Sequence, residues 1–145
     1  FTWLGGSSWA AMDQLDPEYA RQEETYLNGV CYVAGFSMDK TAVTPTSEAF
    51  KEAYHEAYGQ DQEPTVNAAL GFDAYLLALE GIRKAGSASN TQLISRSLYN
   101  VFELEGASGS LSLNANGDPI KQASINMFRP GGETQVYVVS PKWGE

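Results

Sequence analysis

Few side chains in this sequence combine the type and the setting that chemistry requires, and Asp73 is the most suggestive of them. It is the single carboxylate in an apolar stretch from Ala68 to Leu79 that we predict to be helical. A helix that is hydrophobic all the way round belongs in the interior of a packed layer. A carboxylate there must find a partner, stay protonated or face a wet cleft, because an unpaired buried charge is costly. Asp73 is therefore either a residue of a cleft or an acceptor of backbone or tyrosine hydrogen bonds that only ties helices together.

The residue types that carry catalysis or bind metal ions are not grouped in this sequence. His55 is the single histidine, and we expect it to be solvated on the polar face of its helix. One histidine without a second histidine or a cysteine nearby makes no zinc site, and the sequence has neither a G-x-S-x-G motif nor a Ser-His-Asp order. Glu103 and Glu105 alternate along an extended segment and should point to solvent, so no convincing carboxylate pair supports a hydrolase. We predict no catalytic residue, no metal site and no cofactor.

Cys31 and the segment 114–118 have simpler explanations than a reactive thiol or a calcium loop. A single thiol inside an apolar run makes no intramolecular disulfide, and we predict a buried strand residue. The segment 114–118 lacks the acidic first ligand of a calcium loop, and Ile125 would stand where the bidentate glutamate belongs. An Asn-Gly hairpin turn is the preferred interpretation.

The composition indicates one acidic domain with a substantial core. The chain has 145 residues, of which 43% are hydrophobic, and its formal net charge is −9. This length suits one domain, and the hydrophobic fraction argues against a disordered segment. Because the chain is acidic and has no basic stripe, we expect neither nucleic acid nor an anionic membrane surface as a partner.

The order of the predicted elements indicates an α/β protein, because strands and helices alternate before a late hairpin. A glycine-rich loop over 5–8 follows the first strand, and Ser8 is a suitable N-cap for a short helix. The predicted strands cover 1–4, 30–36, 109–113, 120–128 and 134–139. The predicted helices are the short one after Ser8, one begun by Asp16 and Pro17, and those over 47–58, 65–85 and 90–101.

Four motifs, in order, resemble those of one known family. The apolar helix ends at Ala85-Gly86 and is followed by F-x-x-x-G-x-x-G-x-L-x-L-N-x-N-G-D over Phe102 to Asp118. The helix before it carries F-x-x-x-Y-x-x-x-Y-G over Phe50 to Gly59, and a glycine-rich loop ends in Trp9. This pattern resembles the C-terminal part of the type I solute-binding proteins of branched-chain amino acid (Leu/Ile/Val) ABC transporters.

The resemblance implies a C-terminal fragment of a type I periplasmic-binding-protein fold, which has two three-layer α/β/α lobes. In that family the chain crosses between the lobes three times. Residues 1–36 and 103–145 are then expected in the C-terminal lobe, and residues 37–102 should form helices of the N-terminal lobe. The helix 65–85 would lack the sheet that it should cover, so we expect the fragment to associate as a dimer.

The resemblance also implies where a ligand binds. The implied ligand-binding residues are Ser7, Ser8, Trp9, Phe36, Phe72 and Asp73. The loop over 5–9 follows a strand, where open α/β sheets bind ligands. Phe36 would lie at the crossover between the lobes, and Phe72 and Asp73 in the half of their helix nearest the hinge. Ordinary packing roles stay open for all of these residues.

Amino-acid-binding members of the family have an acidic residue near Ser7 or Ser8 that pairs with the ligand's ammonium group, and this sequence has none. We therefore expect a larger apolar or aromatic solute, such as a carboxylate, in preference to leucine.

The resemblance implies a non-enzymatic protein that captures an amino acid-like or aromatic carboxylate solute and presents it to the membrane permease of an ABC transporter. The alternative is the extracellular ligand-sensing domain of a receptor. Either protein would be periplasmic or extracellular, and a signal or lipoprotein leader with its lipid anchor would belong to a preceding N-terminal portion.

Overall fold

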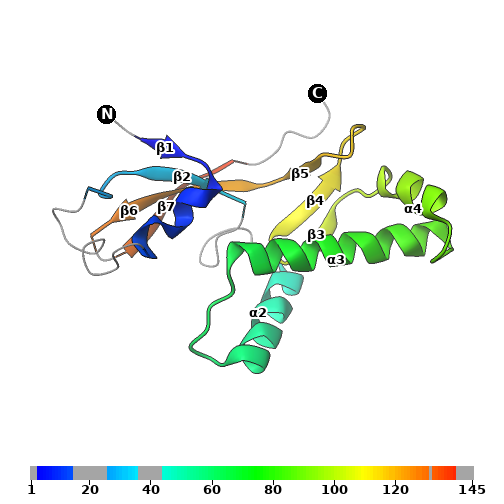
Figure 1. Cartoon of the computed structure of the whole chain (residues 1–145), viewed down its shortest axis with the longest axis horizontal. Helices are drawn as coiled ribbons and strands as arrows, with labels where there is room; N and C mark the ends of the chain where they lie inside the picture. Colours follow the sequence, from blue (N-terminus) through cyan, green and yellow to red (C-terminus); the bar gives the residue numbers. More distant parts are fainter. Residues whose placement is uncertain (1–2, 15–25, 36–43, 131, 140–145) are drawn as a thin grey trace.

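The computed structural model describes residues 3–14, 26–35, 44–130 and 132–139. These residues form two small β-sheets, a 3₁₀ helix and three α-helices (Figure 1). The helical elements are η1 (Ser7–Gln14), α2 (Pro45–Tyr58), α3 (Val66–Ala85) and α4 (Thr91–Leu98). The strands are β1 (Leu4–Gly5), β2 (Cys31–Ala34), β3 (Leu104–Gly106), β4 (Gly109–Leu113), β5 (Pro119–Lys121), β6 (Ala123–Arg129) and β7 (Gly132–Val139). The prediction of an α/β protein is confirmed.

The first sheet has the strand order β1-β2-β6-β7. β1 and β2 are parallel, whereas β6 is antiparallel to both β2 and β7. Its core contains Leu27, Val30, Tyr32, Ala34 and Phe128, and η1 packs against it through Trp9, Ala10 and Met12. Cys31 is buried in β2, as predicted. We call β1, η1, β2, β6 and β7 the sheet body.

The second sheet is antiparallel, with the order β3-β4-β5, and α2 and α3 both contact β3. A smaller apolar cluster lies between these helices and the sheet, where Ala69 and Ala107 are buried and Phe50, Val66 and Phe72 pack around them. Near the C-terminal end of α3, α4 packs closely against Gly81, because a Cβ there would lie only 2.6 Å from Leu98 Cδ2. We call α2, α3, α4, β3, β4 and β5 the helical body.

The ends of the helices follow from their capping residues. α2 begins before the predicted Ser47, because Thr44 and Ser47 form a reciprocal capping box and Pro45 occupies the first turn. α3 starts after Thr65, which accepts a hydrogen bond from Ala68 N, and stops at Gly86 in the left-handed conformation, as predicted.

The region after α4 differs from the prediction. α4 ends at Leu98, short of the predicted residue 101. The carbonyl of Val101, which is buried, accepts a hydrogen bond from Leu113 N in β4 instead. The predicted strand 120–128 is two strands that belong to different sheets, β5 and β6, and β3 has no counterpart among the predicted strands.

The described chain leaves the sheet body after Gly35 and returns to it at Gln122, between β5 and β6 (Figure 1). The sequence-based assignment placed residues 103–145 with 1–36. In this structure β3, β4 and β5 form the sheet of the helical body, whereas β6 and β7 belong to the sheet body. How the two bodies correspond to the lobes of a binding protein stays a prediction.

One side of α3 is exposed in this structure. Tyr75 is 59% exposed and Leu79 is 44% exposed, whereas the opposite side holds the buried Ala69 and Asp73. Among the helices of the described residues, none combines the length and the apolar character that a membrane-spanning helix requires.

Candidate functional site

Asp73 is held by the turn between β3 and β4. Its Oδ1 accepts a hydrogen bond from Ala107 N at 2.6 Å, and its Oδ2 accepts one from Ser108 N at 3.2 Å and another from the Ser108 hydroxyl. The side chain is buried, with 4% of its surface exposed. The carboxylate therefore has the backbone partners that one interpretation of the sequence expected, although it ties a helix to a hairpin and not a helix to a helix.

The two glycines that flank this turn are explained by Asp73 and by backbone geometry. A Cβ on Gly106 would lie 2.7 Å from Asp73 Cγ, which is too close for any side chain. Gly109 has a φ of 99°, a conformation that favours glycine. The apolar helix with its aspartate and the G-x-x-G motif were predicted as separate features. The structure makes them the two sides of one contact.

Lys121, at the end of β5, completes a polar network with Asp73. Its ammonium group donates a hydrogen bond to the Ser108 hydroxyl, which in turn donates to Asp73. Burial lowers the pKa of Lys121 below its usual value, and the nearby Asp73 carboxylate opposes part of that effect. Neither Ser108 nor Lys121 was predicted from the sequence as part of a site. The only signal was that a buried aspartate requires donors.

Phe72 lies in the contact between α2 and α3. It is half-buried, its ring centroid is 5.0 Å from that of Phe50, and it packs against the cluster around Ala69 and Ala107. These contacts give Phe72 a packing role beside any role in ligand binding.

The glycine-rich loop follows β1 at its carboxyl end, next to the parallel strand β2. Ser7 and Ser8 begin η1 and are exposed. The Trp9 indole covers the backbone of Gly5 so closely that a Cβ at Gly5 would overlap the ring, and Trp9 also packs against the core of the sheet body. The loop thus presents two exposed serines at the carboxyl end of β1, whereas Trp9 is half-buried.

The predicted site residues lie in two groups. Phe72 and Asp73 belong to the helical body, and Ser7, Ser8 and Trp9 belong to the sheet body. Phe36 lies outside the described residues. The two bodies approach each other at Gly35, where a Cβ would lie 4.0 Å from both Leu70 Cδ2 and Lys121 Nζ. Phe72 and Asp73 follow Leu70 closely in the sequence of α3, whereas Ser7, Ser8 and Trp9 are far from this junction in the sequence.

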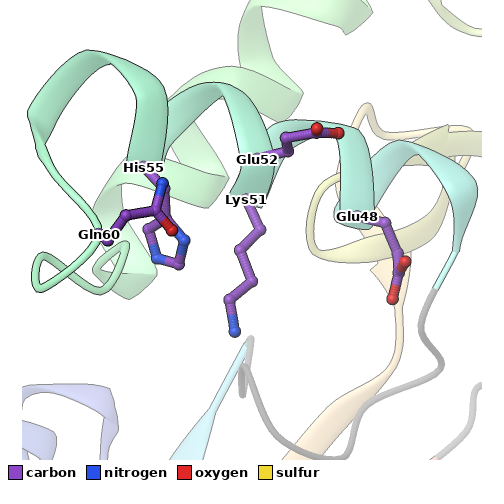
Figure 2. Close-up of a pocket in the computed structure, with 5 residues that line it drawn as sticks. All are labelled: Glu48, Lys51, Glu52, His55 and Gln60. Atoms are coloured by element: carbon purple, nitrogen blue, oxygen red, sulfur yellow. The ribbon is translucent and has the colours of Figure 1, made fainter.

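A separate polar hollow of about 370 Å³ lies on α2 and the turn after it (Figure 2). Its lining residues are Glu48, Lys51, Glu52, His55 and Gln60. Glu63 stands 3.6 Å from both Lys51 Nζ and His55 Nε2. Only 12% of the His55 side chain is exposed, so the prediction that it is solvated is wrong. Within the described residues, no cluster of histidine, cysteine and acidic residues could hold a metal ion.

Comparison with known proteins relates most of the chain to one family. The sequence pattern of the family described as periplasmic binding protein matches residues 6–131. A comparison with curated protein sequences found no match.

Solved structures resemble the chain over nearly its whole length. The leucine-binding protein LivK of Thermotoga maritima is 31% identical over 95% of this chain, with a TM-score of 0.73. The substrate-binding protein LivJ of Streptococcus pneumoniae, solved with isoleucine, is 25% identical over 97% of this chain, also with a TM-score of 0.73. A solute-binding protein from R. palustris, solved with benzoate, is 20% identical over 79% of this chain at a TM-score of 0.62, which shows a shared fold alone. The chain spans 37% of the length of LivK and of LivJ.

Proposed function

Because this chain belongs to the periplasmic binding protein family, we propose that it is part of an extracytoplasmic protein that captures a small solute for an ABC transporter. The match of the family pattern to residues 6–131 is the observation that carries this proposal. The exposed serines after β1 support it, because ligands of open α/β sheets bind at the carboxyl ends of parallel strands. The proposed partner is a membrane permease, and the proposed location is the periplasm or the cell exterior.

The periplasmic binding proteins are non-enzymatic, in agreement with the prediction that this chain catalyses no reaction. The work of such a protein is capture and release, and its specificity rests on the groups that line the closed cleft. We propose that closure brings the loop of the sheet body and the start of α3 towards the same solute.

We propose that Ser7, Ser8, Trp9, Phe36, Phe72 and Asp73 contribute to this site. The serine hydroxyls would bind polar groups of the solute, and the aromatic rings would cover its apolar part. Asp73 would act through the loop that it positions, because Ala107 and Ser108 already occupy its oxygens.

The proposed solute is an apolar or aromatic carboxylate or an amino acid-like molecule. LivK is named as a leucine-binding protein and LivJ was solved with isoleucine, which favours an amino acid. The loop 5–9 lacks an acidic residue to pair with an α-ammonium group, which favours a larger apolar or aromatic acid over leucine.

The second candidate function is the extracellular sensing domain of a receptor. The discriminating observation is the parent gene, because adjacent permease and ATPase genes would indicate a transporter, whereas a following transmembrane helix and signalling domain would indicate a receptor.

A thermal-shift screen of the full-length parent protein tests the proposed function. The panel contains leucine, isoleucine, phenylalanine, benzoate and hydroxylated benzoates. A true solute at about 100 times its Kd should stabilise the protein by roughly 2.7 kcal/mol. A shift with leucine and none with aromatic acids would contradict the proposed preference. Reproducible turnover of ester, glycoside or phosphate substrates, abolished by one point mutation, would contradict the binding-protein function itself.

A further inference from the structure

The place where the chain returns from the helical body to the sheet body is held weakly by its own strand. β5 has three residues, pairs only with β4 in the described structure, and begins with Pro119, which has no N–H to donate. Three residues is the short end of the usual range for a strand, so β5 makes few hydrogen bonds to its neighbour. Another contact is therefore needed to fix the point at which the chain leaves the helical body.

The side chain of Lys121 supplies that contact. Lys121 is the last residue of β5, and β6 of the other sheet begins at Ala123. Its ammonium group donates to the Ser108 hydroxyl, and Ser108 is bound to Asp73 of α3. The end of β5 is thereby connected to the most deeply buried polar group of α3.

The energetics of this network suggest that Lys121 contributes position more than stability. Asp73 has three donors from Ala107 and Ser108, so its oxygens keep hydrogen-bond partners without the lysine. A half-buried ammonium group also has a desolvation cost, and an apolar residue of similar shape often replaces such a charge without loss of stability. A charge that adds little stability still restricts where its segment can lie.

We propose that Lys121, through Ser108 and Asp73, pins the end of β5 to α3 and so confines the pivot between the two bodies to the residues after Lys121. The proposal rests on the proposed function, since hinge closure gives the pivot its purpose. Gly35, the last described residue before the chain leaves the sheet body, lies beside the Lys121 ammonium group, so the pin stands where the two bodies approach each other.

Pulsed electron paramagnetic resonance tests the pin on this chain without any ligand. One spin label replaces the exposed Arg129 at the end of β6 and the other replaces the exposed Gln92 on α4, in a Cys31→Ser background. We expect Lys121→Met to widen the distance distribution between the labels by about twofold or more. Lys121→Arg should preserve the narrow distribution, because it keeps a cation at this position.

The matched control is Lys84→Met. Lys84 also donates a hydrogen bond, to Asn100 O at 2.7 Å, but it lies at the far end of α3 and within one body. Its removal should leave the distribution unchanged. Ser108→Ala removes the acceptor and leaves the lysine in place, so it should widen the distribution as Lys121→Met does, and it decides the test if Lys121→Met does not fold.

The pin would be overturned if the distance distribution of Lys121→Met or of Ser108→Ala were as narrow as that of the unmodified chain. It would also be overturned if Lys84→Met broadened the distribution as much as Lys121→Met does. Because the measurement uses no solute, a failure of the pin is distinguishable from a failure of the proposed function, which would instead appear as the absence of any ligand-induced thermal shift in the parent protein.

Discussion

At the level of single residues, the contact between α3 and the turn after β3 depends on the hydrogen bonds of one buried carboxylate, Asp73. Asp73 accepts hydrogen bonds from two backbone amides and one hydroxyl of the turn between β3 and β4. Position 106 requires glycine for the same reason, because the Asp73 carboxylate occupies the space that a side chain there would need. Two predictions follow from this packing, one for each side of the contact.

Replacement of the charge should destabilise the chain strongly. Asp73→Asn turns one acceptor into a donor that faces the donors of Ser108, and we expect a loss of roughly 2–4 kcal/mol in the free energy of unfolding. Urea denaturation measures it. Asp61→Asn, at an exposed turn position, is the matched control and should stay within about 0.5 kcal/mol. Equal stability of Asp73→Asn and the unmodified chain would show that the network has no energetic role.

Addition of a methyl group should have opposite effects at two glycines. Gly106→Ala forces a Cβ against Asp73 Cγ and should cost about 1–3 kcal/mol. Gly71→Ala lies in the middle of α3, where a Cβ meets no atom within 4 Å among the described residues, and should add about 0.5–1 kcal/mol. Thermal or urea unfolding of both variants gives the comparison. A stable Gly106→Ala would mean that Asp73 does not approach the turn as described.

At the scale of the element, the sequence specified the helices better than the late strands. α3 was predictable to within a residue, because Thr65 and Gly86 mark its ends and its interior is apolar. The prediction of one strand over 120–128 was wrong, because Gln122 carries no local signal that separates β5 from β6. The Asp73 contact joins residues 34 and 35 positions apart, and no local pattern reports such a pairing.

Glu105 on β3 should make the stability of α2 depend on acidic pH. Its carboxylate accepts hydrogen bonds from the Thr46 hydroxyl at 2.7 Å and from Thr46 N at 2.9 Å in the first turn of α2. These bonds hold the pKa of Glu105 below its usual 4.5. The resulting stabilisation is complete above the unfolded pKa and is lost as the pH falls through the lower, folded pKa.

In Glu105→Gln, the urea midpoint should therefore fall less steeply than in the unmodified chain as the pH is lowered from about pH 6 to about pH 3. Thr46→Val removes the hydroxyl that makes the larger contribution, and in that background Glu105→Gln should have a smaller effect. An equally steep fall in Glu105→Gln would contradict the role of this carboxylate.

At the scale of the whole molecule, the chain has two bodies and an exposed apolar helix face. It spans little more than a third of LivK and LivJ, and α3 exposes Leu70, Tyr75 and Leu79. An apolar face of this kind favours association in water. We propose that a sheet of the complete lobe covers this face in the whole protein.

We predict that the 145-residue chain self-associates as a dimer through this face of α3. Size-exclusion chromatography with light scattering at about 50 µM should give twice the chain mass, because α3 has apolar area that a second copy can cover. Tyr75→Lys with Leu79→Lys should restore the monomer. A strictly monomeric mass for the unmodified chain, with sharp cooperative melting, would contradict the prediction.

We propose that the complete protein binds one small solute between its lobes, and isothermal titration calorimetry of the full-length parent measures this binding. The titrant is the solute that gives the largest thermal shift. We predict one bound solute per chain, and an affinity at least about tenfold weaker when Ser7→Ala and Ser8→Ala are combined, since both hydroxyls stand at the carboxyl end of β1. An affinity unchanged by the double substitution would contradict the proposed site, and the absence of binding heat across amino acids and aromatic acids alike would contradict the solute-binding function.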